Sequence, residues 1–159
     1  MKKNIATIIA IVLVVAMCAV CFAACVPTDA SKAQENLKGN GYSVIKLESG
    51  TLSGGITDIL AGLVGDAVPK NWDTIVAGGK DKESIVIINF KDADSAKTFY
   101  NEMKETKKKA SEDLEKEYKD GNITESEYNE IKEELKNTKV GKFLKTVYFG
   151  TKEAIKAAR

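Results

Sequence analysis

Histidine is absent from this 159-residue chain, and cysteine occurs only three times. Without histidine, the chain lacks the commonest general base and the commonest zinc ligand. No cysteine follows Cys25, so no disulfide supports the rest of the chain. A calcium loop needs glutamate at its twelfth position, but Met103 stands there after Asp92. These absences predict a protein that is not an enzyme and that has no catalytic constellation, no cofactor and no metal site.

Charge is also absent from one long stretch near the N-terminus. Lys2 and Lys3 precede an uncharged run from Ile5 to Cys25, and the polar sequence Pro27-Thr28-Asp29 follows it. This order is typical of an export signal, because the lysines stay in the cytoplasm while the apolar run enters the membrane. A run of about twenty residues also matches the ~30 Å core of a bilayer. We therefore expect export, followed either by cleavage of the run or by its retention as an anchor helix.

The end of the apolar run favours cleavage. Phe22-Ala23-Ala24-Cys25 places two small residues directly before a cysteine, which is the pattern that a signal peptidase needs. This sequence resembles the lipobox of bacterial lipoproteins, a family that usually has leucine or another aliphatic residue where Phe22 stands. The resemblance implies that Cys25 receives a diacylglycerol on its sulfur and becomes the first residue after cleavage. Cys18 and Cys21 fit the pattern less well, because larger residues precede them.

Three parts of the chain are expected from these features. Residues 1–24 form a lipoprotein signal peptide, residues 25–30 a short tether and residues 31–159 a single domain. Two acyl chains on Cys25 suffice for lasting attachment, since each buried methylene contributes ~0.8 kcal/mol. The domain is expected on the extracytoplasmic face of the cell membrane, held by this lipid or, alternatively, by residues 5–24 as an uncleaved helix. The 24 basic and 23 acidic residues nearly balance, so the charge does not favour nucleic acid as a partner.

Hydrophobic patterns after Cys25 predict an α+β fold. The strand expected from Ser84 to Phe90 is the clearest, because Ile85-Val86-Ile87-Ile88 is apolar on both faces, as in a central strand covered by helices. Asp92 or Asp94 then caps a helix. A strand followed by a helix recurs near the C-terminus, which suggests a ferredoxin-like antiparallel sheet with helices on one or both faces. The other expected elements are a helix at 30–37, strands at 42–48, 72–77 and 140–149, and a helix that follows Thr151 and ends at Ala158.

A further amphipathic segment lies between Gly54 and Gly65. We interpret it as a helix that covers one face of the sheet. The alternative is a lid or a lipid-touching element, which the nearby membrane would allow. Its apolar residues recur at helical spacing and are Ile56, Ile59, Leu60, Leu63 and Val64.

Lysine and glutamate dominate between Lys104 and Asn137, where apolar residues become sparse. This composition predicts a charged helical hairpin inserted into the domain. Asp120-Gly121-Asn122 is the expected turn, and Thr124-Glu125-Ser126-Glu127 has the capping-box form that starts a helix. Across the hairpin, the apolar residues expected to meet are Leu114, Tyr118, Tyr128, Ile131 and Leu135.

The segment 114–135 carries the sequence Gly121-Asn122-Ile123-Thr124-Glu125-Ser126-Glu127-Tyr128. It resembles the short C-terminal (SHOCT-like) helical hairpin of bacterial membrane and envelope proteins, although here structured sequence follows it. The resemblance implies at most a role in oligomerisation or docking. We therefore expect a non-enzymatic binding or interaction module, with Lys104–Asn137 as the segment that contacts a protein partner.

Two other functions are compatible with the sequence. A small-molecule sensor or carrier would use an apolar pocket under the 56–64 helix. Ordinary core packing is the simpler explanation for the aromatic residues expected to line it, which are Trp72, Tyr42 and Tyr148. An envelope-polymer hydrolase would need paired carboxylates, for which the candidates are Asp58, Asp66 and Asp73.

Two groups of basic residues are candidates for contact with the membrane surface. They are Lys107-Lys108-Lys109 and the set Lys139, Lys142 and Lys145. Each lysine near anionic headgroups contributes up to ~1 kcal/mol. Interleaved glutamates oppose this attraction.

Overall fold

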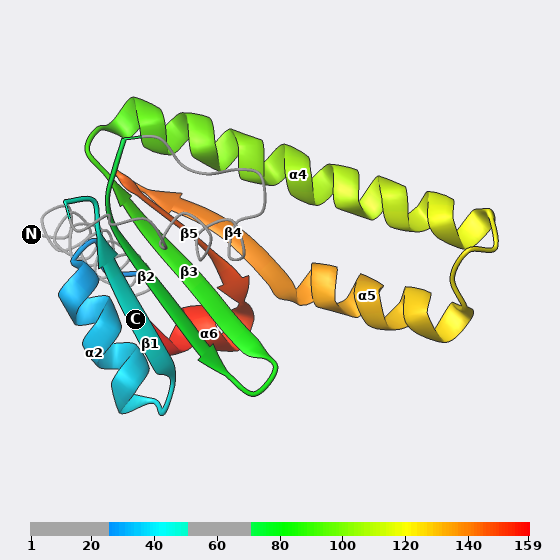
Figure 1. Ribbon diagram of the computed structural model, residues 1–159, viewed down its shortest axis with the longest axis horizontal. Coiled ribbons are helices and arrows are strands. Elements are labelled where there is room, and N and C mark those ends of the chain that lie inside the picture. Colours follow the sequence, from blue (N-terminus) through cyan, green and yellow to red (C-terminus); the bar gives the residue numbers. More distant parts are fainter. Residues whose placement is uncertain (1–25, 51–70) are drawn as a thin grey trace, which may run out of the picture.

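The computed structural model describes residues 26–50 and 71–159, and it shows one sheet with helices on both faces (Figure 1). The expected signal peptide, the lipidation candidate Cys25, the helix expected at 56–64 and the carboxylate candidates Asp58 and Asp66 lie outside the described residues. In chain order the elements are α2 (Ala30–Gly39), β1 (Ser43–Glu48), β2 (Trp72–Lys80), β3 (Glu83–Phe90), α4 (Ala93–Lys119), α5 (Glu125–Asn137), β4 (Thr138–Phe143), β5 (Thr146–Thr151) and α6 (Lys152–Ala157).

The strands lie in the order β1-β2-β3-β5-β4, and every neighbouring pair is antiparallel. β3 lies at the centre, and its residues 85–88 are all buried. The predicted α+β class, antiparallel sheet and central strand are therefore confirmed. The ferredoxin-like connectivity is not observed, because β1 pairs directly with β2, whereas a split βαβ unit places another strand between them.

The segment 140–149, expected as one strand, belongs to two strands that form a hairpin. Phe143 and Thr146 form the last pair, so the turn consists of Leu144 and Lys145. Leu144 has a positive φ of 51°. The prediction of one strand is wrong because this turn contains none of the residues, such as glycine, asparagine or proline, that normally mark a chain reversal.

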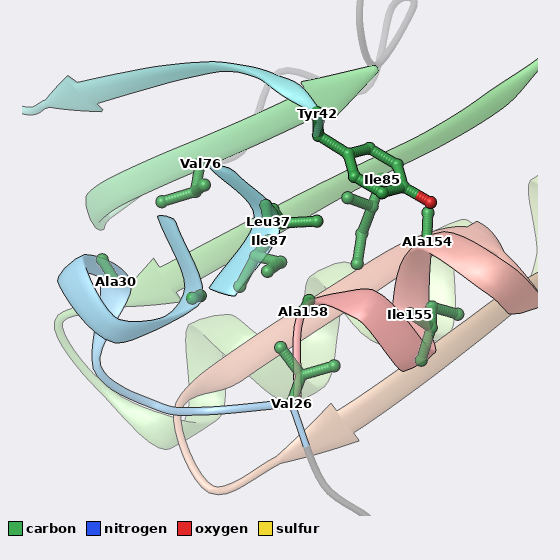
Figure 2. Packing of buried hydrophobic residues seen from close by; sticks show 11 residues of the cluster. Val26, Ala30, Leu37, Tyr42, Val76, Ile85, Ile87, Ala154, Ile155 and Ala158 are labelled. Atoms are coloured by element: carbon green, nitrogen blue, oxygen red, sulfur yellow. The ribbon is translucent and has the colours of Figure 1, made fainter. Parts of the chain in front are cut away.

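α2 and α6 cover one face of the sheet (Figure 2). Leu37 of α2 and Ile155 of α6 are buried there, and such side chains each stabilise the fold by about 1.5–3 kcal/mol. Val26 belongs to the same cluster and is only 1% exposed. Val26 and Ala30, expected as part of a tether, therefore contribute to the core of the domain.

The N-terminal part of α4 covers the opposite face of the sheet. Ala96 and Phe99 are buried against it, and the ring centroids of Phe99 and Phe90 lie 5.5 Å apart. Trp72 belongs to the same cluster. Both faces of β3 are thus covered, as its apolar sequence predicts.

Candidate functional site

The charged hairpin extends well past the end of the sheet (Figure 1). Its first helix, α4, is continuous over 27 residues and is about 40 Å long at 1.5 Å per residue. Asp92 caps this helix by accepting from the Ser95 N–H at 2.7 Å, and this hydrogen bond is the main cause that lowers the pKa of Asp92. There is no break at Lys104, where the insert was expected to begin. We call residues 104–137 the arm.

The turn at the tip of the arm and the start of α5 confirm the sequence predictions. Gly121 has a φ of 75°, and its N–H donates to the Tyr118 carbonyl at 3.1 Å. The Thr124 N–H donates to Glu127 Oε2 at 2.8 Å, and the Glu127 N–H donates to Thr124 Oγ1 at 3.3 Å. Both hydrogen bonds of the capping box are therefore present, and they define where α5 begins.

A narrow apolar seam joins the two helices of the arm. The rings of Tyr118 and Tyr128 stack with centroids 4.4 Å apart, so these two residues meet across the hairpin as expected. Leu114, one helical turn before Tyr118, is buried. Tyr128 is 8% exposed, but Tyr118 and Ile131 are 37% and 39% exposed. The seam thus closes the hairpin and leaves part of its apolar surface in contact with water.

Tyr128 also organises charges across the arm. Its hydroxyl donates to the Glu115 carboxylate and accepts from Lys132 Nζ at 2.7 Å. Lys132 Nζ lies 3.6 Å from Glu115 Oε1 and 4.7 Å from the centroid of the Tyr128 ring. The hydrogen bond from Tyr128 is the main cause that lowers the pKa of Glu115, and the hydrogen bond to Tyr128 is the main cause that raises the pKa of Lys132.

We expect Tyr128→Ala to loosen the arm and leave the sheet intact. Removing a buried aromatic side chain costs about 3 kcal/mol, and we expect this loss to be local because Tyr128 stacks on Tyr118 and bonds to Glu115 and Lys132 within the arm. Amide hydrogen exchange should become much faster in residues 114–135 and stay unchanged in β3. Equal acceleration in β3 would contradict this expectation.

Tyr128→Phe is the matched control, because it keeps the ring stack and removes only the hydroxyl. The pKa of Glu115 should rise toward its ordinary value, as followed by NMR titration of the side-chain carboxyl carbon. Because the folded pKa is lowered, this carboxylate stabilises the arm above its ordinary pKa, and the effect is lost as the pH falls through the folded pKa. That acid sensitivity should be smaller in Tyr128→Phe.

The base of the arm is fixed to the sheet on both sides. The first turns of α4 pack against the sheet through Ala96 and Phe99. α5 ends at Asn137 and β4 begins at Thr138, so no linker separates them. Lys107 Nζ donates to the Thr138 carbonyl at this junction. Burial there, followed by the nearby charge of Lys139, lowers the pKa of Lys107. Lys107 therefore links α4 to the start of β4 at the base of the arm.

The outer part of the arm is strongly acidic. Between Ser111 and Leu135, acidic residues outnumber basic ones by ten to three, whereas the lysine-rich cluster is confined to the base. A hollow of about 510 Å³ lies between α5 and the β2–β3 turn. Its lining includes Glu83, Glu130, Glu133, Glu134 and Glu153. The arm thus presents carboxylates on its inner side and around its exposed apolar residues.

The aromatic residues expected around a small-molecule pocket do not come together. Trp72 packs in the cluster under α4, whereas Tyr42 and Tyr148 pack on the opposite face of the sheet. Tyr42 donates to the Glu83 carboxylate, and burial together with this bond raises its pKa to about 12. These side chains therefore act in core packing.

A different hollow lies on the α4 side of the sheet, where the first turns of α4 do not reach. Its volume is about 450 Å³. Ile45, which lines it and pairs with Ala77 of β2, is 52% exposed. The apolar side chains that line it are those of Ile45, Ala77, Ile85, Val86 and Phe149.

Of the three carboxylates proposed for a hydrolase, the structure describes only Asp73, so it shows no pair among them. Asp73 is exposed at the start of β2, and its two expected partners lie outside the described residues. Within residues 26–50 and 71–159, no three metal-ligating side chains gather to hold an ion. In the same part of the chain, no helix has both the length and the apolarity that crossing a membrane requires.

Comparison with known proteins gives no matching family model, no similar curated protein and no similar solved structure. Sequence reasoning missed the link between Lys107 and Thr138 and the Tyr128–Glu115 hydrogen bond. The hydrogen bond between Lys132 and Tyr128 could have been predicted from their four-residue spacing, because such residues share one helix face.

Proposed function

We propose that this chain is a lipid-anchored extracytoplasmic protein that presents the arm to a protein partner. The lipobox-like sequence that ends at Cys25 supports the anchor, and the SHOCT-like resemblance of residues 114–135 supports a docking role for the arm. The proposal assigns no catalysis and no nucleic-acid partner to the chain.

The observation that carries this proposal is the way the arm is held. It is fixed at its base by the continuous α4 and by the direct passage from α5 into β4. The far end extends beyond the sheet (Figure 1). A projection that is stiff at its base presents its side chains in a fixed orientation, so little conformational entropy is lost when a partner binds.

The chemistry of the arm indicates what kind of partner it fits. Tyr118 and Ile131 offer partly exposed apolar surface, and carboxylates surround them in sequence. Interfaces combine an apolar contact with a charged rim of complementary sign. We therefore infer a partner whose contact surface has an apolar depression bordered by lysine or arginine.

The proposal predicts a discrete cross-linked product from the arm. A photoreactive amino acid in place of Ile131, in the full chain in its native cells, should give one major adduct. The same residue in place of Lys38, exposed on α2 on the face of the sheet opposite to α4, is the control and should give none. Raised salt during irradiation should lower the yield of the adduct, because salt screens the attraction between the charged rim and the partner. Absence of an adduct at position 131, or the same adduct at both positions, would contradict the proposal.

A shortened arm provides a second variant. Deleting residues 112–118 and 128–134 removes seven residues, close to two helical turns, from each helix and shortens the arm by about 10 Å. The deletion removes the seam residues Leu114, Tyr118, Tyr128 and Ile131. It keeps Gly121, the capping-box pair Thr124 and Glu127, Lys107 and the buried residues Ala96 and Phe99 of α4. The variant should therefore keep a cooperative unfolding transition while it fails to compete with the wild-type chain for the partner found by cross-linking.

The apolar hollow at Ile45 favours a second candidate, a small-molecule carrier. Apolar ligand sites are typically 300–1,000 Å³, and about 450 Å³ falls in this range. A lipid or other apolar ligand that binds there should raise the melting temperature of the wild-type chain. Ala77→Trp, which would fill the hollow, should abolish that rise. A screen in which no ligand shifts the melting temperature would remove this candidate.

A further inference from the structure

One end of the sheet brings together the β4–β5 turn and the segment that follows Val26. Asn89 Nδ2 donates to the Thr28 carbonyl at 2.9 Å, and the Thr146 hydroxyl donates to Asn89 Oδ1 at 2.8 Å. Thr28 and Leu144 also line one shared hollow of about 290 Å³. We call this surface, formed by Thr28, Asn89, Leu144 and Lys145, the anchor end.

Leu144 is unusual in its exposure and in its backbone conformation. Its side chain is 63% exposed, the highest value among the exposed large apolar residues of the described chain. Its φ of 51° lies in the left-handed region, which costs a non-glycine residue roughly 1–2 kcal/mol. A two-residue turn with positive φ at its first position strongly prefers glycine there. Neither packing nor turn geometry therefore explains a leucine at this position.

Lysines surround this leucine. Lys142 Nζ donates to the Leu144 carbonyl at 3.1 Å, and Lys145 Nζ donates to the Lys91 carbonyl at 3.4 Å. Asp73 and Asp92 also lie at this end, so its net charge is small and the exposed apolar side chain is its distinguishing feature. A leucine flanked by lysines suits the boundary of a bilayer, where the apolar chain enters the lipid and the long amines reach the headgroups.

We propose that the anchor end rests on the bilayer and that Leu144 inserts between the lipid headgroups. This inference rests on the proposed lipid at Cys25. Cys25 is three residues from Thr28, a span of at most about 11 Å along the chain, and Val26 between them is buried. A lipid on Cys25 therefore holds the anchor end within reach of the membrane surface.

The position of the arm fits this orientation. The arm extends toward one end of the molecule's longest axis, and the β4–β5 turn lies toward the other (Figure 1). Its acidic outer part is repelled by anionic headgroups, so standing away from the membrane is the favourable arrangement. The same contact that seats the anchor end thus directs the arm outward.

Lysine acetylation of the lipidated full chain tests this inference. The protein, with its lipid verified by intact mass, is placed in vesicles of phosphatidylethanolamine and phosphatidylglycerol, or in neutral detergent, and treated with a water-soluble amine-reactive reagent. In vesicles, Lys142 and Lys145 should react several-fold more slowly than in detergent. Lys82, in the β2–β3 turn, and Lys119, near the tip of the arm, should react at the same rate in both.

Leu144→Gly separates a membrane role from a structural one. Glycine relieves the positive φ, so the melting temperature should stay the same or rise. The protection of Lys142 and Lys145 should nevertheless be lost. Unchanged protection in this variant would overturn the insertion of Leu144, and so would equal reaction of all four lysines in the wild-type chain or protection of Lys119. A chain without lipid would instead refute the proposed anchor, so the two failures are distinguishable.

Discussion

Replacing Cys25 by alanine is expected to abolish fatty-acid labelling of the chain. Only the Cys25 sulfur follows two small residues, so only this thiol is expected to be acylated. Cells fed an alkyne-tagged fatty acid should give a labelled wild-type band and no labelled Cys25→Ala band. The variant should also keep residues 1–24, because cleavage in the lipobox family depends on the cysteine.

Cys18→Ala and Cys21→Ala are the matched controls for this experiment. Each removes a thiol from the same apolar run without changing Phe22-Ala23-Ala24-Cys25. Both variants should remain labelled. Labelling that persists in Cys25→Ala, or that is lost only in one of the controls, would assign the lipid to another residue.

Gly150→Ala is expected to destabilise the domain by about 3 kcal/mol, near the upper end for overpacking. A Cβ at this position would lie 2.2 Å from the Ser84 carbonyl oxygen and 2.7 Å from Ile85 Cα. These atoms belong to the backbone of β3, the central strand, so they cannot move without distorting the pairing of β3 with β5. Thermal unfolding of the detergent-solubilised chain should show a melting temperature lower by roughly 10 °C.

Gly39→Ala is the control for the same chemical change. A Cβ there would have nothing within 4 Å, and Gly39 is the last residue of α2. Alanine restricts the unfolded chain more than glycine does, so stability should rise by about 0.5 kcal/mol. Equal losses in both variants would show that the approach of β5 to β3 at Gly150 is not as close as described.

Local patterns predicted much of this fold correctly. β3 is evident because Ile85 to Ile88 are buried on both faces, and a strand of this kind needs cover on each side. The capping box at Thr124 and Glu127 is predictable because its hydrogen bonds join residues three apart. The stack of Tyr118 on Tyr128 follows from the turn between them, since a tight reversal brings nearby residues of the two helices together.

Features that depend on tertiary contacts were not predictable. The turn at Leu144 has no local signal, because its sequence lacks a turn-forming residue and only the pairing of β4 with β5 defines it. Val26 enters the core in a cluster that includes residues of α6, at the other end of the chain, so its burial could not be predicted from the local sequence. The fixed base of the arm depends on Lys107 reaching Thr138, a contact over 31 positions.

Intact mass of the chain extracted from its native membrane tests the central claim, that a lipid on Cys25 holds this domain at the cell surface, most directly. A molecule that begins at Cys25 and carries the added mass of its acyl chains is the expected result. A mass that includes residues 1–24 with all three thiols unmodified would contradict it.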